Sequence, residues 1–534
     1  MKILGISSWF HDSSACLLVD GDIVAYAEEE RFSRRKHTPE YPKSAIDWIL
    51  DENGLCLDDL DEVVYFMNPW GYLATGVRAV LANFPKSLAL AGPKAGTVWP
   101  LMRLRSMAGL KRQLCRDHNA RGKFKLVYLN HYRTHQASAF FASEFDDVAI
   151  LTMDFAVDGT TEVIAEGRGN KIDDRLMHTV PNGFALLYAT ITHVLGFKWY
   201  DEFKVMGMAA YGEPRFLDGI EKLYQLDPDS GELQLDFSYF DFQNYGMQKL
   251  FTERMKELFG EPRVPGSEIT QKEYDLAVSL QEATNRYGLA MARLAKKLTN
   301  SKNLCMAGGV AQNCVMNQVI CESGLFENVF LQPLAGDVGC SLGGALYRYH
   351  QDHGQPRKYS MRHLYLGPSY DEDVEPVIDR TGLVARDSED WHGDVAQAIA
   401  DGLVVGFYDG RMEAGPRALG SRSILADARS PEMKEILNSR VKHREHFRPF
   451  APSVLADKVD LVFEPLPTCR SLDYMIVTMN VRPEWNDQLP AITHNDGTAR
   501  VQTVQKAYAS NYYTIIEKFF ALTGVPLVIN TSFN

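Results

Sequence analysis

Short apolar runs separated by small polar turns mark the first thirty residues. Residues 2–8 (KILGISS) form one run, residues 9–15 form a polar turn, and two further runs within 16–31 meet at Asp20-Gly21. An Asp-Gly pair between two apolar runs is a strong hairpin signal. The pattern therefore predicts a strand, a tight turn and then a β-hairpin.

The same outline returns at residues 147–168. The run VAILTMD is followed by the turn FAVDGTT and then by the apolar run TEVIAEGRG. Such a repeat suits two related α/β halves that present both turns to one phosphate-bearing ligand, as in actin-like ATPases and sugar kinases. Unrelated mixed sheets also contain hairpins, so the pattern leaves both interpretations open. Under the first, Asp158 and Gly159 in the second turn are candidate nucleotide-binding residues.

A glycine pair follows the next predicted strand. Residues 269–300 carry apolar side chains at helical spacing, and the run NLCMA leads from them directly into Gly308 and Gly309. Glycines let the main chain approach a ligand closely, and a following helix N-terminus attracts negative charge. The loop and the nearby Asn313 are therefore candidates for nucleotide binding, although the pattern is unspecific by itself.

A second glycine-rich break lies at 333–346. It places Asp337 before another predicted helix, where its carboxylate would cap backbone amides or bind a cation.

Polar and turn residues dominate 350–372, which predicts a domain boundary there. We expect a first domain over 1–355 and a second, mixed α/β domain over 365–534, with strand-like runs GLVVGFYDG and VPLVINTSF.

Residues 70–127 have a different, basic composition. Eleven lysines and arginines are opposed only by Asp117: Arg78, Lys86, Lys94, Arg103, Arg105, Lys111, Arg112, Arg116, Arg121, Lys123 and Lys125. The leucine, alanine and methionine content predicts an inserted helical subdomain. It forms a solvated basic face, a lid for an anionic substrate, or a subunit contact in a homodimer.

Composition narrows the class of protein. The 534 residues, 45% of them apolar, suffice for two to four domains with buried cores. A net charge of −13 disfavours nucleic acid as a partner. The eight cysteines are scattered without a CxxC pair, which favours a reducing compartment. No apolar run is long enough to span a bilayer, and we therefore expect a cytoplasmic protein without membrane contact.

Two histidines four residues apart begin the first chemical constellation. His131 and His135 lie on one face of a predicted helix, Asp154 ends a predicted strand, and Asp337 lies in its glycine-rich loop. Imidazole and carboxylate ligands suit Fe²⁺, Mn²⁺ or Zn²⁺ better than Ca²⁺ or Mg²⁺. A chance pair on an amphipathic helix remains the alternative.

Two further groups carry candidate chemistry. His11 lies in the first turn; a histidine titrates near neutrality and would take a proton from a hydroxyl nucleophile. Lys36 follows in RFSRRKH and is the second candidate of this group, although the ordinary interpretation of that segment is an exposed basic turn. In the second domain, cationic residues recur among Gly-Pro and Pro-Phe-Ala-Pro turns, as a polyphosphate clamp requires. The candidate anion-binding residues are Arg417, Arg422, Lys442, Arg448, Arg500 and Ser532, with Arg444 beside them.

Eight motifs in order resemble the NodU-type O-carbamoyltransferase family, and the resemblance runs nearly end to end. They are GISSWFHDSSACLLVDGDIVAYAEEERFSRRKH, NHYRTHQASAFF, KVMGMAAYG, LCMAGGVAQNCVMN, QPLAGDVGCSLGGAL, GRMEAGPRALGSRSILAD, VKHREHFRPFAPSVL and INTSFN. The resemblance implies a duplicated actin-like domain, related to the threonylcarbamoyl-transfer enzymes of tRNA modification, followed by a YrdC-like domain. Relatives continue beyond the last motif, so we expect a C-terminally truncated second domain.

The resemblance also implies roles for the candidate residues. His131, His135, Asp154 and Asp337 match an iron(II)-type metal site, His11 matches the base for the acceptor hydroxyl, and Lys36 matches its partner. The Gly308-Gly309 loop with Asn313 matches an adenosine-binding segment, and the cationic residues of the second domain match a site for carbamoyl phosphate and ATP, with Mg²⁺ possible beside the ATP. Carbamoyl adenylate would form in the second domain, and the first would transfer the carbamoyl group to a hydroxyl of a small-molecule natural product.

Other functions stay open from the residues alone. An actin-like kinase would send the γ-phosphoryl group of ATP directly to a hydroxyl, without carbamoyl phosphate. A tRNA threonylcarbamoyl-transfer enzyme shares the first-domain motifs. The acidic net charge disfavours a tRNA substrate, but the basic segment at 70–127 leaves this function open. A non-catalytic nucleotide switch would need no cationic cluster in the second domain.

Overall fold

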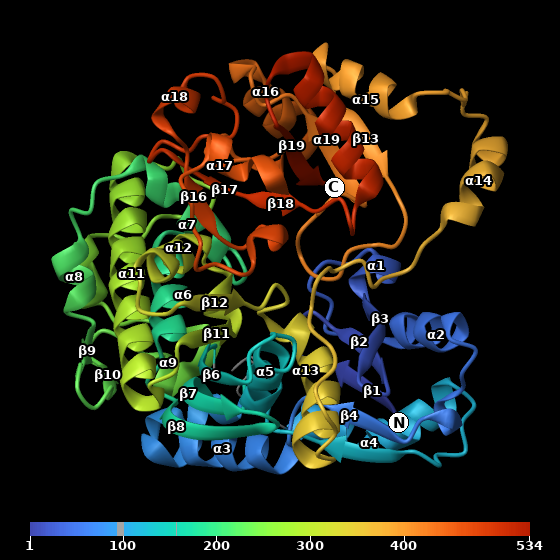
Figure 1. Cartoon of the computed structure of the whole chain (residues 1–534). Helices are drawn as coiled ribbons and strands as arrows, with labels where there is room; N and C mark the ends of the chain where they lie inside the picture. Colours follow the sequence, from blue (N-terminus) through green and yellow to red (C-terminus); the bar gives the residue numbers. More distant parts are fainter. Residues whose placement is uncertain (93–100, 156, 534) are drawn as a thin grey trace. The chain divides into compact units, whose positions relative to one another are not determined.

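The computed structural model describes residues 1–92, 101–155 and 157–533, and the chain divides into two compact units (Figure 1). The first unit covers Met1–Met361 and the second Arg362–Asn534. The division falls inside the polar segment 350–372. No helix of the described residues combines the length and the apolar character that crossing a bilayer requires.

A five-stranded sheet opens the first unit, in the order β3-β2-β1-β4-β5. Its strands are β1 (Lys2–Ser7), β2 (Ser14–Val19), β3 (Asp22–Glu28), β4 (Glu62–Tyr65) and β5 (Lys125–Tyr128). Strands β1, β2 and β3 run antiparallel, while β4 is parallel to β1 and β5 is parallel to β4. Asp20 and Gly21 both have positive φ, as the predicted hairpin turn demands.

The second sheet repeats the first. Its order is β12-β11-β6-β7-β8. The strands are β6 (Asp147–Met153), β7 (Thr160–Arg168), β8 (Lys171–Thr179), β11 (Asn303–Ala307) and β12 (Asn328–Leu331). Again the first three run antiparallel and the last two run parallel to the first. The predicted duplication of an actin-like α/β domain is confirmed, because two sheets with the same order and directions follow one another along the chain.

Two helices fill the space between these sheets. Helix α5 (His131–Phe140) follows the first sheet but packs on β6 and β11 of the second, and α13 (Cys340–Leu346) follows the second sheet but packs on β1 and β2 of the first. The two helices also pack on each other. Glycine permits this: a Cβ on Gly5 would lie 1.8 Å from the Ser341 carbonyl oxygen, and a Cβ on Gly343 would lie 1.9 Å from that of Thr134.

Further helices cover the first unit. Helix α11 (Gln271–Thr299) begins with a capping box between Thr270 and Glu273 and packs on β6, β7 and α12. The other elements are α1 (Glu30–Ser33), α2 (Lys43–Glu52), α6 (Phe184–Val194), α7 (Glu202–Met208), α8 (Leu217–Glu221), β9 (Tyr224–Leu226), β10 (Leu233–Leu235), α9 (Phe242–Tyr245), α10 (Met255–Phe259) and α12 (Cys314–Glu322).

The basic segment lies between β4 and β5, inside the first half of the duplicated unit. It forms α3 (Pro69–Ala82), the 3₁₀ helix η2 (Lys86–Ala91) and α4 (Leu101–Asp117). Residues 93–100, with Lys94, lie outside the described residues. The expected range of 70–127 extends too far, since Lys125 begins β5, an edge strand of the first sheet.

The second unit is a mixed α/β fold, as expected. Its main sheet has the order β13-β14-β19-β15-β18, and all neighbours are antiparallel except β15 and β18. The strands are β13 (Val405–Tyr408), β14 (Arg422–Ala426), β15 (Ala451–Leu455), β18 (Gln502–Val504) and β19 (Leu527–Ser532), with a separate pair, β16 (Thr478–Asn480) and β17 (Thr498–Arg500). The helices are α14 (Val374–Thr381), α15 (Trp391–Ala400), α16 (Pro431–Ile436), α17 (Val459–Val462), α18 (Pro483–Asn486) and α19 (Ser510–Thr523).

Candidate functional site

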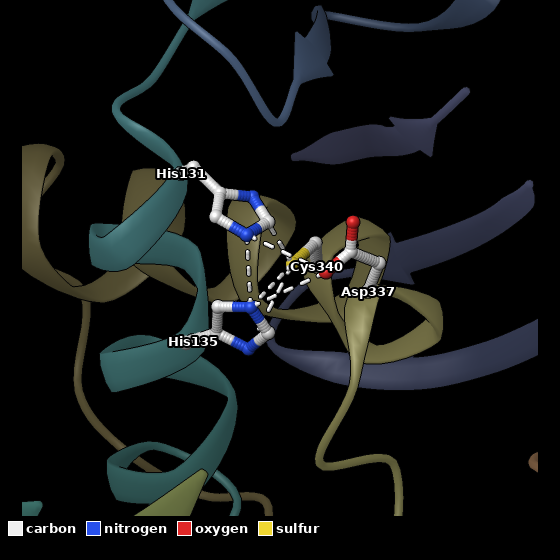
Figure 2. Close-up of side chains that lie close together, drawn as sticks. All are labelled: His131, His135, Asp337 and Cys340. Carbon is white, nitrogen blue, oxygen red and sulfur yellow. Dashed lines mark hydrogen bonds and ion pairs between the residues drawn. The ribbon is translucent and has the colours of Figure 1, made fainter. Parts of the chain in front are cut away.

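A buried group of metal-type side chains lies where α5 meets α13. His131 and His135 occupy the first and second turns of α5, Asp337 lies in the 3₁₀ helix η7 (Asp337–Gly339), and Cys340 is the first residue of α13. Figure 2 shows the two imidazoles turned toward the carboxylate and the thiol. One ligand atom from each of the four lies within 4.8 Å of every other.

The atoms of this group are spaced as ligands of one ion would be. The Nε2 atoms of His131 and His135 are 3.1 Å apart, and they lie 3.4 and 3.6 Å from Asp337 Oδ1. Cys340 Sγ is 3.5 Å from His135 Nε2. Bond lengths of a tetrahedral zinc site imply about 3.3 Å between two nitrogen ligands and about 3.6 Å between nitrogen and sulfur. The donor set therefore fits a divalent transition metal.

Asp154 approaches the same two imidazoles. Its Oδ2 lies 3.0 Å from His131 Nε2 and 3.6 Å from His135 Nε2, while its Oδ1 accepts a hydrogen bond of 2.9 Å from the Gly309 amide. Gly308, at positive φ, brings that amide in beside β6, because a Cβ there would lie 2.2 Å from the Met153 carbonyl oxygen. The structure thus brings the four predicted metal ligands together and adds Cys340, which the sequence analysis missed.

Charge at this centre favours a cation. Burial lowers the pKa of His131 and His135, but the surrounding acidic groups raise both well above the usual histidine value. Burial raises the pKa of Asp154, but hydrogen bonds from the two histidines bring it well below the usual carboxyl value. Asp337 Oδ2 is buried and makes no hydrogen bond among the described residues, although His11 Nε2 lies 3.4 Å away. A buried carboxylate oxygen that makes no hydrogen bond, in a negative field, suits a bound metal ion.

His11 stands at the edge of this centre. Its Nε2 lies 3.4 Å from Asp337 Oδ2, and its Nδ1 donates to Asp12 Oδ2 at 2.8 Å. The other oxygen of Asp12 accepts from His37 Nδ1, also at 2.8 Å, and the Tyr200 ring stacks on His37 with 5.1 Å between centroids. Burial lowers the pKa of His11, but Asp337 and Asp12 raise it to about 9. Asp12 and His37 are residues at this site that sequence reasoning missed.

Lys36 does not join this group. Its side chain is exposed, and no hydrogen bond or ion pair links it to another residue in the part of the chain that the structure describes. The neighbouring His37 makes the contact instead. A catalytic role for Lys36 stays a prediction.

The candidate nucleotide-binding residues of the first unit have structural partners. Asn313 caps α12 and exchanges amide hydrogen bonds of 2.9 and 3.0 Å with Gln281. The Asp158 carbonyl oxygen accepts from Thr75 Oγ1 at 2.9 Å. Gly159 has a φ of 94°, and a Cβ there would lie 2.5 Å from a Thr75 methyl group. These contacts hold the Asn313 segment and the Asp158-Gly159 turn in position within the first unit. The binding of a nucleotide by these residues stays a prediction.

In the second unit, two of the residues predicted to bind an anion are in contact with each other. Lys442 Nζ donates to the Ser532 carbonyl oxygen at 2.7 Å and approaches Ser532 Oγ at 3.3 Å. Arg422 is anchored by its own loop: it stacks on Tyr408 at 3.6 Å from the ring centroid and donates to the carbonyl oxygens of Asp409, Gly410 and Ser421. Arg422 therefore shapes the loop that holds the half-buried Arg417.

Three arginines of the second unit lie close enough for their charges to interact. Burial, Arg448 and Arg500 lower the pKa of Arg444 to about 9, and the acidic group that acts against them is Glu445. Arg444 itself is held by Asn438 Oδ1 at 2.7 Å and lies over the Phe450 ring. Glu445 lies 3.8 Å from Arg448 Nη1, and the binding of an anion beside these arginines stays a prediction.

The protein is a two-unit α/β protein with a buried group of histidines and carboxylates in one unit and a group of cationic residues in the other. Comparison with family models identifies the family to which it belongs. The model described as carbamoyltransferase N-terminus matches residues 2–346, and the model described as carbamoyltransferase C-terminus matches residues 396–534. The chain belongs to this carbamoyltransferase family.

Relatives match over most of their length. An uncharacterized protein, sll1178, of Synechocystis sp. strain PCC 6803 is 38% identical over 100% of this chain and 91% of its own. The nodulation protein NolNO of Sinorhizobium fredii is 34% identical over 99% of this chain and 75% of its own. The nodulation protein NolO of Bradyrhizobium diazoefficiens is 36% identical over 76% of this chain and 73% of its own.

Solved structures are more distant. HypF of T. kodakarensis has a TM-score of 0.37 at 13% identity, over 65% of this chain and 47% of its own. Component A of the (R)-2-hydroxyglutaryl-CoA dehydratase of Acidaminococcus fermentans has a TM-score of 0.33 at 13% identity, over 65% of this chain and 97% of its own. Neither supports a conclusion about function.

Proposed function

We propose that the protein is an ATP-dependent O-carbamoyltransferase. It forms carbamoyl adenylate from carbamoyl phosphate and ATP and transfers the carbamoyl group to a hydroxyl of a small-molecule natural product. Membership of the carbamoyltransferase family supports carbamoyl transfer as the overall reaction. The observation that carries the finer proposal is the crowding of Arg444, Arg448 and Arg500 in the second unit.

That crowding matches the needs of the first half-reaction. Carbamoyl phosphate and ATP carry several negative charges that repel each other, and guanidinium and ammonium groups lower this repulsion while they orient the reactants. Water releases phosphate from carbamoyl phosphate, the carbamate oxygen attacks the α-phosphorus of ATP, and pyrophosphate leaves. Lys442 and Ser532, already in contact, add one ammonium and one hydroxyl donor.

The second half-reaction belongs to the first unit. His11 Nε2 takes the proton from the acceptor hydroxyl, the hydroxyl oxygen attacks the carbamoyl carbon, and AMP leaves. Asp12 orients His11 for this step. His131, His135, Asp154 and Asp337 would hold a divalent metal, of which Fe²⁺, Mn²⁺ and Zn²⁺ suit the donors, and its chemistry when bound is that of a Lewis acid.

Pyrophosphate release tests the first half-reaction. We expect the full chain to release pyrophosphate from ATP only when carbamoyl phosphate is present, and Arg448→Ala to reduce this release by at least about 100-fold, the effect of losing a preorganised charge contact. Arg386→Ala is the matched control, since Arg386 is an exposed arginine of the same unit paired with Asp394. Pyrophosphate release that does not depend on carbamoyl phosphate would overturn the proposal. Transfer of the γ-phosphoryl group without pyrophosphate release would overturn it in favour of a kinase.

A further inference from the structure

We propose that the outward face of α3, together with the neighbouring face of α4, attaches the protein to the surface of a bilayer that contains anionic lipids. The inference concerns a surface outside the candidate site and does not depend on the proposed reaction. The expectation of no membrane contact rested on the absence of a spanning run. No helix of the described residues can cross a bilayer, but a helix that lies in the interface needs only an apolar face beside basic residues.

Helix α3 turns apolar side chains toward solvent. Trp70, Val77 and Leu81 follow one another at intervals of seven and four residues, so they lie on one side of the helix. Trp70 is 76% exposed, Leu81 is 67% exposed, and Phe84, just beyond the end of the helix, is 64% exposed. A surface helix ordinarily presents polar side chains on its outward side. Neighbouring exposed apolar side chains of this size mark a surface that binds a protein or a membrane.

The opposite side of α3 is held by the rest of the first unit. The Tyr72 ring packs edge-on against the Phe10 ring with 5.5 Å between centroids, and Thr75 Oγ1 donates to the Asp158 carbonyl oxygen at 2.9 Å. These contacts fix the rotation of α3 about its axis, so the exposed apolar side cannot turn inward. Because Phe10 precedes His11, they also place the first turn about one helix diameter, roughly 10 Å, from the proposed surface.

The charges carried by this segment are all positive. The sequence has no Asp or Glu at positions 63–116, although the whole chain has a net charge of −13. Arg78 and Lys86 are exposed beside the apolar residues, and α4, which packs against α3, exposes Arg105 and Arg112 two turns apart (Figure 1). No ion pair engages these four side chains in the part of the chain that the structure describes. Unpaired cations on an acidic protein favour an anionic partner at this face.

The combination of apolar and basic side chains favours a membrane over other partners. A nucleic acid would use the cations but leave the tryptophan, leucine and phenylalanine side chains in water. A second copy of the same face would bring arginines against arginines, because a twofold contact pairs identical surfaces. An anionic bilayer accommodates both kinds of side chain: the apolar ones enter the interface, and the lipid headgroups attract the cations.

Vesicle binding by the full chain tests the inference. The probes are vesicles of phosphatidylcholine alone and of an equal mixture with phosphatidylglycerol, and flotation separates the bound protein. We expect binding to the mixed vesicles only, and weaker binding at high salt because ions screen the charges. The double variant Arg105→Gln, Arg112→Gln should bind about 25-fold more weakly, since each cation near the surface contributes about fivefold. The double variant Trp70→Gln, Leu81→Gln should lose at least about tenfold, because binding scales with the apolar area that is buried.

A matched control and a depth measurement accompany these variants. Val264→Gln should bind as the wild type does, since Val264 is a 69% exposed apolar residue of the first unit that lies between Glu261 and Glu268 in the sequence. Brominated phospholipids should quench the fluorescence of Trp70, and the single variant Trp70→Phe should lose this quenching while it still binds. Thermal unfolding at the wild-type temperature shows that each variant is folded.

Three results would overturn the inference. Wild-type protein that does not float with the mixed vesicles excludes the attachment. Binding that is lost in the arginine variant but unchanged in the Trp70 and Leu81 variant indicates a surface for polyanions in general. A dimer in sedimentation that the Trp70 and Leu81 variant converts to monomer, without vesicle binding, assigns the face to a second copy of the chain. None of these assays contains ATP or carbamoyl phosphate, so their results do not depend on the proposed reaction.

Discussion

Asp12 holds two histidines with one carboxylate. Because an ionised carboxylate only accepts hydrogen bonds, the Nδ1 atoms of His11 and His37 must both carry protons. His11 can therefore accept a proton only at Nε2. Because Asp337 and Asp12 raise its pKa to about 9, His11 acts as a base only after Nε2 has lost its own proton. Asp12 and His37 both have positive φ, a costly backbone conformation that clusters at functional sites.

Replacing Asp12 by asparagine tests this positioning. An amide oxygen can serve only one of the two imidazoles in this way, so Asp12→Asn should let His11 adopt the wrong tautomer and slow carbamoyl transfer by about 100-fold or more. Pyrophosphate release should not change. Transfer is measured with ¹⁴C-carbamoyl phosphate and a sugar or polyol that the wild type accepts in a screen.

A spectroscopic readout separates orientation from simple loss of structure. The ¹⁵N shifts of the His11 ring should report a change of tautomer in Asp12→Asn and none in Asp51→Asn, an exposed substitution on α2. An unchanged ring signal with slowed transfer would contradict the role given to Asp12.

At the scale of elements, the approach of α13 to β1 decides where Asp337 and Cys340 lie. A Cβ at Gly5 would meet the Ser341 carbonyl oxygen, a backbone atom that cannot rotate away. Gly5→Ala should therefore destabilise the first unit by about 1–3 kcal/mol or more, the usual cost of overpacking, and lower its thermal unfolding temperature.

Gly109→Ala is the matched control for this substitution. Gly109 lies in α4 with no atom within 4 Å of the added Cβ, so alanine should stabilise the helix by about 1 kcal/mol. Calorimetry on the full chain checks both changes. An equal shift in the two variants would show that the close contact between β1 and α13 does not limit stability.

Local signals made several elements predictable. The Asp20-Gly21 hairpin follows from two residues that tolerate positive φ, and the long helix over 269–300 appears as Gln271–Thr299 because its spacing and its capping box are both local. The anchoring of Arg422 by its own loop was not predictable, because its carbonyl acceptors become neighbours only when the loop folds.

The metal centre shows the same limit. The i, i+4 spacing predicted that His131 and His135 share a face. Their grouping with Asp154 and Asp337 was one candidate constellation beside a chance histidine pair, and resemblance to a family favoured it. Cys340 and His37 were missed because each reaches its partners through tertiary packing. An Asp three residues before a Cys, at the start of a helix, was the one local signal for the sulfur.

At the scale of the whole first unit, neither half of the duplication contains the metal centre alone. The histidines follow the first sheet, whereas Asp154, Asp337 and Cys340 belong to the second half. The packing of α5 and α13 joins the two sets. Metal binding should therefore stabilise the association of the halves, because an ion that binds only the folded state shifts the folding equilibrium.

The division of chemistry between the two units can be tested by mixing two variants. His131→Ala should lose its metal, measured by elemental analysis, yet still release pyrophosphate, whereas Arg448→Ala should keep its metal and form no adenylate. An equimolar mixture of the two should transfer far less ¹⁴C-carbamoyl label than the wild type, because a mixed anhydride that leaves the protein hydrolyses in water. Full recovery would show that free carbamoyl adenylate survives to reach a second molecule. A loss of pyrophosphate release in His131→Ala itself would instead show that the first unit takes part in adenylation.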